Sequence, residues 1–169
     1  MRKLWLQVPC LLALLMAAPV AHAQDDEADS KSDDPVARLS SRVCLAVPFA
    51  GPTDWGLLSS IEHGHPAYRQ LLGYEPGTPA GKMSEKLKKD VSPLSFVSKD
   101  DPPILIVHGD ADVVVPIQHG TVLKKALDEA GVENELLVVK GGRHNVAGAG
   151  VGETPKRATE FIRKRLLAK

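Results

Sequence analysis

Apolar residues in the second half of the chain fall into short runs and stripes that predict alternating strands and helices. Pro103 to His108 (PILIVH) is a near-continuous apolar run, as expected of a strand buried on both faces. Pro116 opens a helix that Gly131 ends, with proline at the helix start and glycine just past its end. The apolar residues of this helix lie on one stripe: Val122, Leu123, Ala126, Leu127 and Ala130.

A second strand and helix follow. Glu135 to Lys140 (ELLVVK) predicts a strand, and Gly141 to Gly152 predicts a loop. Thr154-Pro155 predicts the cap of a last helix, with an inner face of Ala158, Phe161, Ile162 and Leu166. Buried strands that alternate with helices indicate a parallel sheet covered on both sides. The predicted fold class is therefore α/β, a mostly parallel sheet with helices on both faces.

The first half of the mature chain is less regular. Arg42 to Phe49 (RVCLAVPF) predicts a strand buried on both faces, and Pro48 places the end of that strand there. Turn residues follow, and short helical pieces are expected near Trp55–Ile61 and Pro66–Leu72. Lys82 to Asp90 predicts a lysine-rich helix with a solvated charged face.

Residues 1–23 have the organisation of a secretory signal peptide. Arg2 and Lys3 form a positive start, an apolar run follows, and Ala21-His22-Ala23 supplies small residues for cleavage. The apolar run is shorter than the roughly 20 residues that span a bilayer, so we expect a secreted or periplasmic protein with no membrane contact after cleavage. Residues 24–34 are expected to form an acidic linker, and residues 35–169 the folded domain.

Composition and charge restrict the class of protein further. The chain has 169 residues, of which 43% are hydrophobic and 25% charged, which fits one small folded domain. Its 21 basic and 21 acidic residues balance, so charge gives no reason to expect nucleic acid as a partner. Cleavage after Ala23 would leave Cys44 as the one cysteine, which excludes an intramolecular disulfide and predicts a buried, inert thiol.

Ionisable side chains follow two neighbouring strands. Asp110 and Asp112 come directly after the strand that ends at His108, and His144 follows the strand that ends at Lys140. Reactive groups of open parallel sheets gather in such loops, and an acid that precedes a histidine is the order of α/β-hydrolases. We favour Asp112 as the acid, because Asp110 is well placed to bond local backbone amides in the turn.

The other histidines are assigned no catalytic role. His108 is expected to be a structural residue at the strand end, and His63, His65 and His119 are expected at the surface. Together His108, the two aspartates and His144 could supply nitrogen and oxygen ligands to a metal, but they lack a known ligand spacing. The sequence therefore predicts neither a metal nor a cofactor.

The segment from Ser92 to His144, centred on HGDADVVVP (His108–Pro116) and ending in Gly-Gly-Arg-His, resembles the C-terminal portion of secreted bacterial α/β-hydrolases. The resemblance is to acetyl-xylan and feruloyl esterase-like enzymes, which merge with dienelactone hydrolase and prolyl-oligopeptidase-like catalytic domains. Asp34–Ala37, Ser40–Val43 and Gly51–Asp54 extend the similarity to roughly residues 33–168. It implies a partial α/β-hydrolase fold in which Asp112 is the acid and His144 the base of a Ser-Asp-His triad.

Two family motifs are missing. The nucleophile of these enzymes lies in a G-x-S-x-G elbow, and no serine of this chain has the flanking glycines. The glycine-rich oxyanion loop is missing as well. The chain is thus expected to act on small-molecule or polysaccharide-linked carboxylic esters, or to be inactive for lack of a nucleophile. A prolyl-oligopeptidase-like serine peptidase and a non-catalytic fragment or binding module remain alternatives. A half-domain would expose a sheet edge, so self-association is also predicted.

Overall fold

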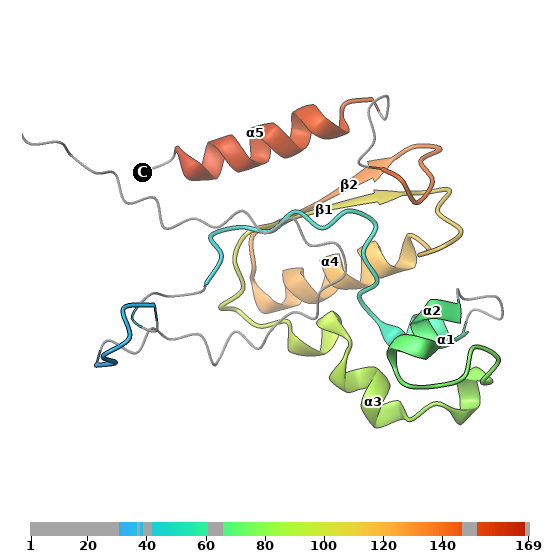
Figure 1. Cartoon of the computed structure of the whole chain (residues 1–169). Coiled ribbons are helices and arrows are strands. Elements are labelled where there is room, and N and C mark those ends of the chain that lie inside the picture. The colour runs from blue at the N-terminus through green and yellow to red at the C-terminus, as the bar shows by residue number, and fades with distance from the viewer. Residues whose placement is uncertain (1–30, 37, 39–41, 61–65, 147–151, 168–169) are drawn as a thin grey trace, which may run out of the picture.

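The computed structural model describes residues 31–36, 38, 42–60, 66–146 and 152–167. Its centre is a pair of parallel strands, β1 (Ile104–Gly109) and β2 (Asn134–Val139), joined by helix α4 (Gln118–Ala130). The register runs from Ile104 opposite Asn134 to Gly109 opposite Val139. Gly131, just past the helix, adopts a left-handed conformation with φ of 75°. The predicted strand–helix–strand unit is therefore confirmed (Figure 1).

A third extended segment, residues 45–50, lies parallel to the other side of β1. Ala46 and Phe49 form isolated bridges to β1, and the amide of Val107 donates to the carbonyl of Pro48 at 2.9 Å. A regular ladder would also require residue 48 to donate an amide hydrogen, and proline has none. The prediction of a regular strand from Arg42 to Phe49 is therefore wrong, because the segment forms only isolated bridges. Successive side chains of this extended segment point to opposite sides, so Leu45 and Val47 face the core whereas Cys44 is exposed.

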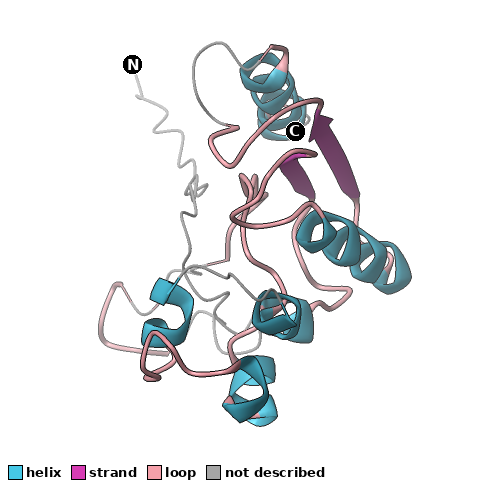
Figure 2. Ribbon diagram, turned by 90° about the vertical axis from the view of Figure 1, so that its right-hand side faces the viewer, coloured by secondary structure: helices cyan, strands magenta, loops and turns pink. Residues whose placement is uncertain are grey.

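Helices cover both faces of the sheet (Figures 1 and 2). On one face, Ile106 of β1 packs with two leucines of α4, and Val132 closes this cluster. On the other face, helix α5 (Thr154–Leu166) places Ala158 and Phe161 against Leu105, Val107 and the third segment. The predicted helix-covered parallel sheet is confirmed, and β1 is its most buried strand.

Three short helices lie beside this core: α1 (Trp55–Ser60), α2 (Pro66–Leu71) and α3 (Glu85–Asp90). Two 3₁₀ turns accompany them, η1 (Ala80–Lys82) and η2 (Pro93–Phe96). The predicted helix from Lys82 to Asp90 begins later than expected, because Ser84 caps α3 by accepting a bond from the amide of Leu87. The buried hydroxyl of Ser92 links the group, since it accepts from the amide of Trp55 and donates to the carbonyl of Lys88.

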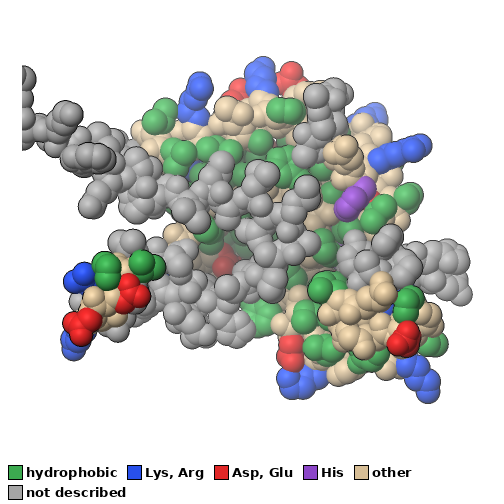
Figure 3. Space-filling model, viewed as in Figure 1, with side chains coloured by type: hydrophobic (Ala, Val, Ile, Leu, Met, Phe, Trp, Pro, Cys, Tyr) green, Lys and Arg blue, Asp and Glu red, His purple; other side chains and the backbone are tan. Residues whose placement is uncertain are grey.

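Two local predictions are wrong. Thr154 does not cap α5; it is the first residue of the helix, and Glu153 before it makes no side-chain capping bond. Cys44 is not a buried thiol, because it lies on the outward side of the third segment and is disulfide-bonded. Among the described residues, no helix is long and apolar enough to span a membrane. On the face shown in Figure 3, the described acidic and basic side chains are interspersed.

Candidate active site

The candidate site lies where the turn after β1 meets the loop after β2. Because the strands are parallel, both connections leave the same edge of the sheet. The two connections touch at Gly109, where an added Cβ would lie 2.1 Å from the carbonyl oxygen of Gly142. Only glycine allows this approach. The amide of Ala111 then donates to the same carbonyl at 3.0 Å.

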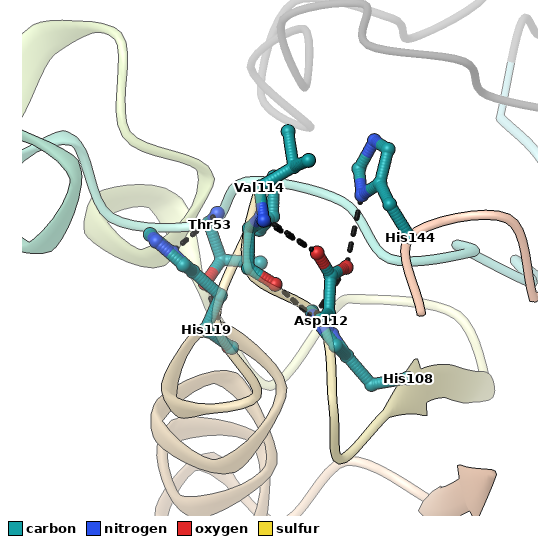
Figure 4. Close-up of polar contacts among 7 residues, drawn as sticks. Thr53, His108, Asp112, Val114, His119 and His144 are labelled. Carbon is teal, nitrogen blue, oxygen red and sulfur yellow. Dashed lines mark hydrogen bonds and ion pairs between the residues drawn. The ribbon is translucent and has the colours of Figure 1, made fainter. Parts of the chain in front are cut away.

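Asp112 is the centre of the site (Figure 4). Its side chain is fully buried, and Oδ1 accepts hydrogen bonds from the amides of Val114 (2.8 Å) and Val115 (2.9 Å). Its other oxygen, Oδ2, lies 2.9 Å from Nδ1 of His144. A carboxylate accepts, so Nδ1 of His144 carries the proton and Nε2 of the neutral ring is free to accept one. Nε2 points away from Asp112, and the His144 side chain is 45% exposed.

Asp110 occupies a different position. Its Oδ1 accepts a hydrogen bond of 2.6 Å from the amide of Gly141, 31 residues further along the chain. The structure thus brings Asp112, not Asp110, to His144, as the sequence predicted. The reason given for that choice was wrong, because Asp112 is the residue that bonds the local amides of its turn and Asp110 bonds the neighbouring loop.

His108 supports the turn from beneath. It is buried, and its Nε2 donates to the carbonyl of Val115 at 2.8 Å. The same nitrogen lies 3.7 Å from Oδ2 of Asp112. These contacts fit the predicted structural role at the strand end. In the described part of the chain, Nδ1 of His108 is buried without a partner.

His119 was expected at the surface and is instead completely buried. Its Nδ1 accepts hydrogen bonds from the amides of Thr53 (3.2 Å) and Asp54 (3.3 Å), and the Thr53 hydroxyl donates to its carbonyl at 2.7 Å. His119 therefore fastens the turn after the third segment to α4. A sequence signal for this existed, since His119 lies four and eight residues before the buried Leu123 and Leu127.

Burial, with a smaller contribution from the nearby His108, lowers the pKa of His119 from its ordinary 6.5 to about 4. Asp54 and Asp112 oppose this shift more weakly. His119 is consequently neutral at physiological pH, as a nitrogen that accepts two amide hydrogens must be. His63 and His65 lie outside the described residues.

The described residues add no nucleophile to this pair. Within them, the imidazole ring of His144 has no hydrogen-bond partner other than Asp112, and the buried Ser92 uses its hydroxyl within the helical region. The same residues contain no group of three side chains arranged to hold a metal ion. What the site offers is a buried carboxylate that orients an exposed imidazole.

A helix-covered parallel sheet that delivers an acid and then a histidine from adjacent strand ends has the chain order found in α/β-hydrolases. Residues 10–127 match the BD-FAE family, and the chain belongs to this esterase-type family. The match begins within the predicted signal peptide and ends in α4, before His144.

Several known proteins similar to this chain are named as ester hydrolases. Over 80 residues it is 35% identical to the "probable carboxylic ester hydrolase LipM" of Mycobacterium tuberculosis, covering 46% of this chain and 18% of that protein. A solved truncated carbohydrate esterase from gut microbiota is 30% identical with a TM-score of 0.62, covering 78% of this chain and 45% of that one.

A second solved structure is the acetyl ester-xyloside bifunctional hydrolase from Caldicellulosiruptor lactoaceticus, 25% identical with a TM-score of 0.63. It is matched over 82% of this chain and 48% of its own length. An acylaminoacyl peptidase, 19% identical, shares the fold alone. The chain thus spans about half the length of these esterase structures and a smaller share of the curated relative, which agrees with a portion of an α/β-hydrolase.

Proposed function

We propose that this chain carries the acid and the base of a Ser-Asp-His triad that hydrolyses carboxylic esters. The observation that supports this role is the 2.9 Å contact between Oδ2 of Asp112 and Nδ1 of His144. The buried carboxylate fixes the tautomer of the ring, and Nε2 of the half-exposed ring faces away from it. This is the arrangement that a general base requires.

In the proposed reaction, Nε2 of His144 takes the proton of a serine hydroxyl as the serine oxygen attacks the ester carbonyl. The tetrahedral intermediate then collapses, the carbon–oxygen bond to the alcohol breaks, and the imidazolium returns its proton to the leaving alcohol. Water attacks the acyl-serine by the same proton transfers and releases the acid. Asp112 stays ionised and stabilises the imidazolium in each step.

For the substrate we propose esters carried by carbohydrates. The relatives described as a carbohydrate esterase and as an acetyl ester-xyloside hydrolase support this class, as does the carboxylic ester hydrolase. An ester of a small acyl group with a sugar hydroxyl, in a free sugar or within a polysaccharide, is a substrate that fits all three descriptions. We also propose that residues 1–23 direct the protein to the cell exterior or periplasm, where such substrates occur.

The proposed triad lacks its third member within residues 1–169, which contain no G-x-S-x-G. Two members without a nucleophile and an oxyanion hole supply little catalysis. We therefore expect the folded chain to remain unlabelled by a fluorophosphonate probe. A labelled serine, located by mass spectrometry and lost in His144→Ala, would instead reveal a nucleophile outside the expected motif.

The role of the pair itself is tested by supplying the missing half. The full chain is mixed with the separately produced N-terminal portion of a related carbohydrate esterase that contains the serine elbow, and p-nitrophenyl acetate hydrolysis is followed. We expect hydrolysis that falls about 100-fold or more with His144→Ala. Asp128→Ala, which breaks an exposed ion pair on α4, is the matched control and should leave the rate unchanged. Equal rates with and without His144, in a mixture that is active, would refute the proposed base.

Self-association is proposed from the edge of the third segment. The backbones of Leu45, Val47 and Phe49 form no hydrogen bonds with any described residue. Their amides and carbonyls alternate with those that bond β1, so they line the opposite edge and can pair with another chain. We expect light scattering to show dimers or larger species at micromolar concentration. A monodisperse monomer would contradict this.

A further inference from the structure

We propose that Asp110 is a positioning residue that holds the loop of His144 against Asp112. The inference rests on the proposed role of His144 as the base and adds a residue to which no function in the reaction has been given. Asp110 touches neither His144 nor the expected position of a substrate. It acts through the backbone of Gly141, three residues before His144.

Besides the contact between Asp112 and His144, three hydrogen bonds join the turn after β1 to the end of β2 and its loop. Two are made by backbone amides: Asp110 to the carbonyl of Val139 (3.2 Å) and Ala111 to the carbonyl of Gly142 (3.0 Å). Almost any residue at these positions would make them. The third, from the amide of Gly141 to Oδ1 of Asp110, is the shortest at 2.6 Å and needs a side-chain acceptor. A carboxylate strengthens such a bond.

Gly141 is the point where the loop changes direction. Its φ of 67° is left-handed, and the next amide, of Gly142, turns back to the carbonyl of Val139 at 2.9 Å. Asp110 therefore restrains the loop at its sharpest turn. The other end of the loop is fixed by Val146, which is 1% exposed within the core cluster beneath α5.

His144 lies between these two anchors. Its carbonyl accepts from the amide of Val146, and its ring reaches Asp112 from a partly exposed position. Loss of the Asp110 side chain would loosen one end of this short span, which then keeps only the two backbone bonds, while the core contacts of Val146 remain. The expected consequence is a loosened contact between Asp112 and His144 in a chain that is still folded. This separates positioning of the base from support of the fold.

The tautomer of His144 measures that contact without substrate or nucleophile. In the full chain at a pH where the ring is neutral, ring ¹⁵N shifts report which nitrogen carries the proton. We expect the Nδ1–H form in the wild type, and its loss in Asp112→Ala as the reference for a broken contact. Asp110→Ala should likewise lose the Nδ1–H signal in favour of Nε2–H. Asp110→Asn should retain it, because the amide oxygen can still accept from Gly141.

Asp101→Ala is the matched control. Asp101 also accepts a backbone amide, that of Ser98 at 2.9 Å, but away from the site, so His144 should keep its tautomer. If Asp110→Ala does not fold, Asp110→Ser serves in its place, since its side chain is one atom shorter and stops short of Gly141. An unchanged Nδ1–H form in a folded Asp110→Ala or Asp110→Ser variant would overturn the proposal. A failure of the mixing experiment with a normal tautomer response would instead refute only the proposed reaction.

Discussion

The Asp112 carboxylate satisfies three donors while being fully buried, and this makes it a structural residue as well as a candidate acid. Asp112→Ala removes the acceptor of the Val114 and Val115 amides and leaves them without partners in the turn. Unsatisfied buried donors cost about 1–3 kcal/mol each, so we expect the free energy of unfolding to fall by about 2–4 kcal/mol. Urea denaturation followed by circular dichroism measures this change.

The exposed aspartate of α3 provides the comparison for this measurement. Asp90 pairs with Lys86 at 2.5 Å in solvent, and such pairs contribute little. We expect Asp90→Ala to change the unfolding free energy by less than about 1 kcal/mol. Equal losses for the two alanine variants would show that the Asp112 turn is satisfied by other means.

His119 should make stability depend on pH in the acid range. Its pKa is about 4 in the folded chain and near 6.5 in the unfolded chain, so the unfolded state takes up a proton first as the pH falls. Its contribution is complete above pH 6.5 and is lost progressively down to about pH 4, by a total of about 3 kcal/mol. The charged and titratable groups facing it are His108, Asp54 and Asp112.

Urea denaturation at several pH values between 4 and 7 tests this dependence. His119→Gln stays neutral across the range and should show a shallower loss of stability, with the other histidines unchanged. Parallel curves for the wild type and His119→Gln would mean that His119 is not buried in neutral form.

Among the structural elements, the two strand-end connections depend on Gly109. An added Cβ would lie 2.1 Å from the Gly142 carbonyl oxygen and 2.9 Å from that of Arg143, both backbone atoms that cannot rotate away. We expect Gly109→Ala to lower the unfolding free energy by at least about 2 kcal/mol and to separate His144 from Asp112. Thermal melting measures the first effect and the His144 tautomer the second. Gly77→Ala, with no atom within 4 Å of the new Cβ, should change neither.

Periodicity predicted the elements of the second half well, because each is long enough to show a repeat. The stripe of α4 and the glycine at its end gave that helix within about two residues. The third segment was harder to predict from the sequence. Its hydrogen-bond ladder is interrupted at Pro48, and this depends on which carbonyl of β1 lies opposite that residue. The burial of His119 does not follow from its residue type, because histidine is usually at least partly exposed. Its spacing to Leu123 nevertheless places it on the inner stripe of α4.

The sequence predicted the pair of Asp112 and His144, but it did not predict the contacts that hold this pair in place. Order along the chain and placement after strands identified Asp112 and His144, which the structure joins. The role of Asp110 depends on a contact between two turns, and a sequence gives no distances across turns. The bond from Gly141 to Asp110 spans 31 residues, so only the parallel register of β1 and β2 brings the two together.

At the scale of the whole molecule, the described part of the sheet stops at the third segment. The third segment pairs with β1 on one side, and its other edge has no backbone partner among the described residues. The esterase structures matched here are about twice as long as the matched share of them. Under the proposed function, a further strand at this edge would both complete the sheet and bring a serine towards His144.

The predicted cleavage after Ala23 conflicts with the disulfide at Cys44. Within one chain the only possible partner of Cys44 is Cys10, and cleavage after Ala23 would remove it. From the proposed export we expect the protein recovered from the periplasm or medium to begin at Gln24 by intact mass spectrometry. A recovered chain that still begins at Met1 would contradict cleavage of the predicted signal peptide.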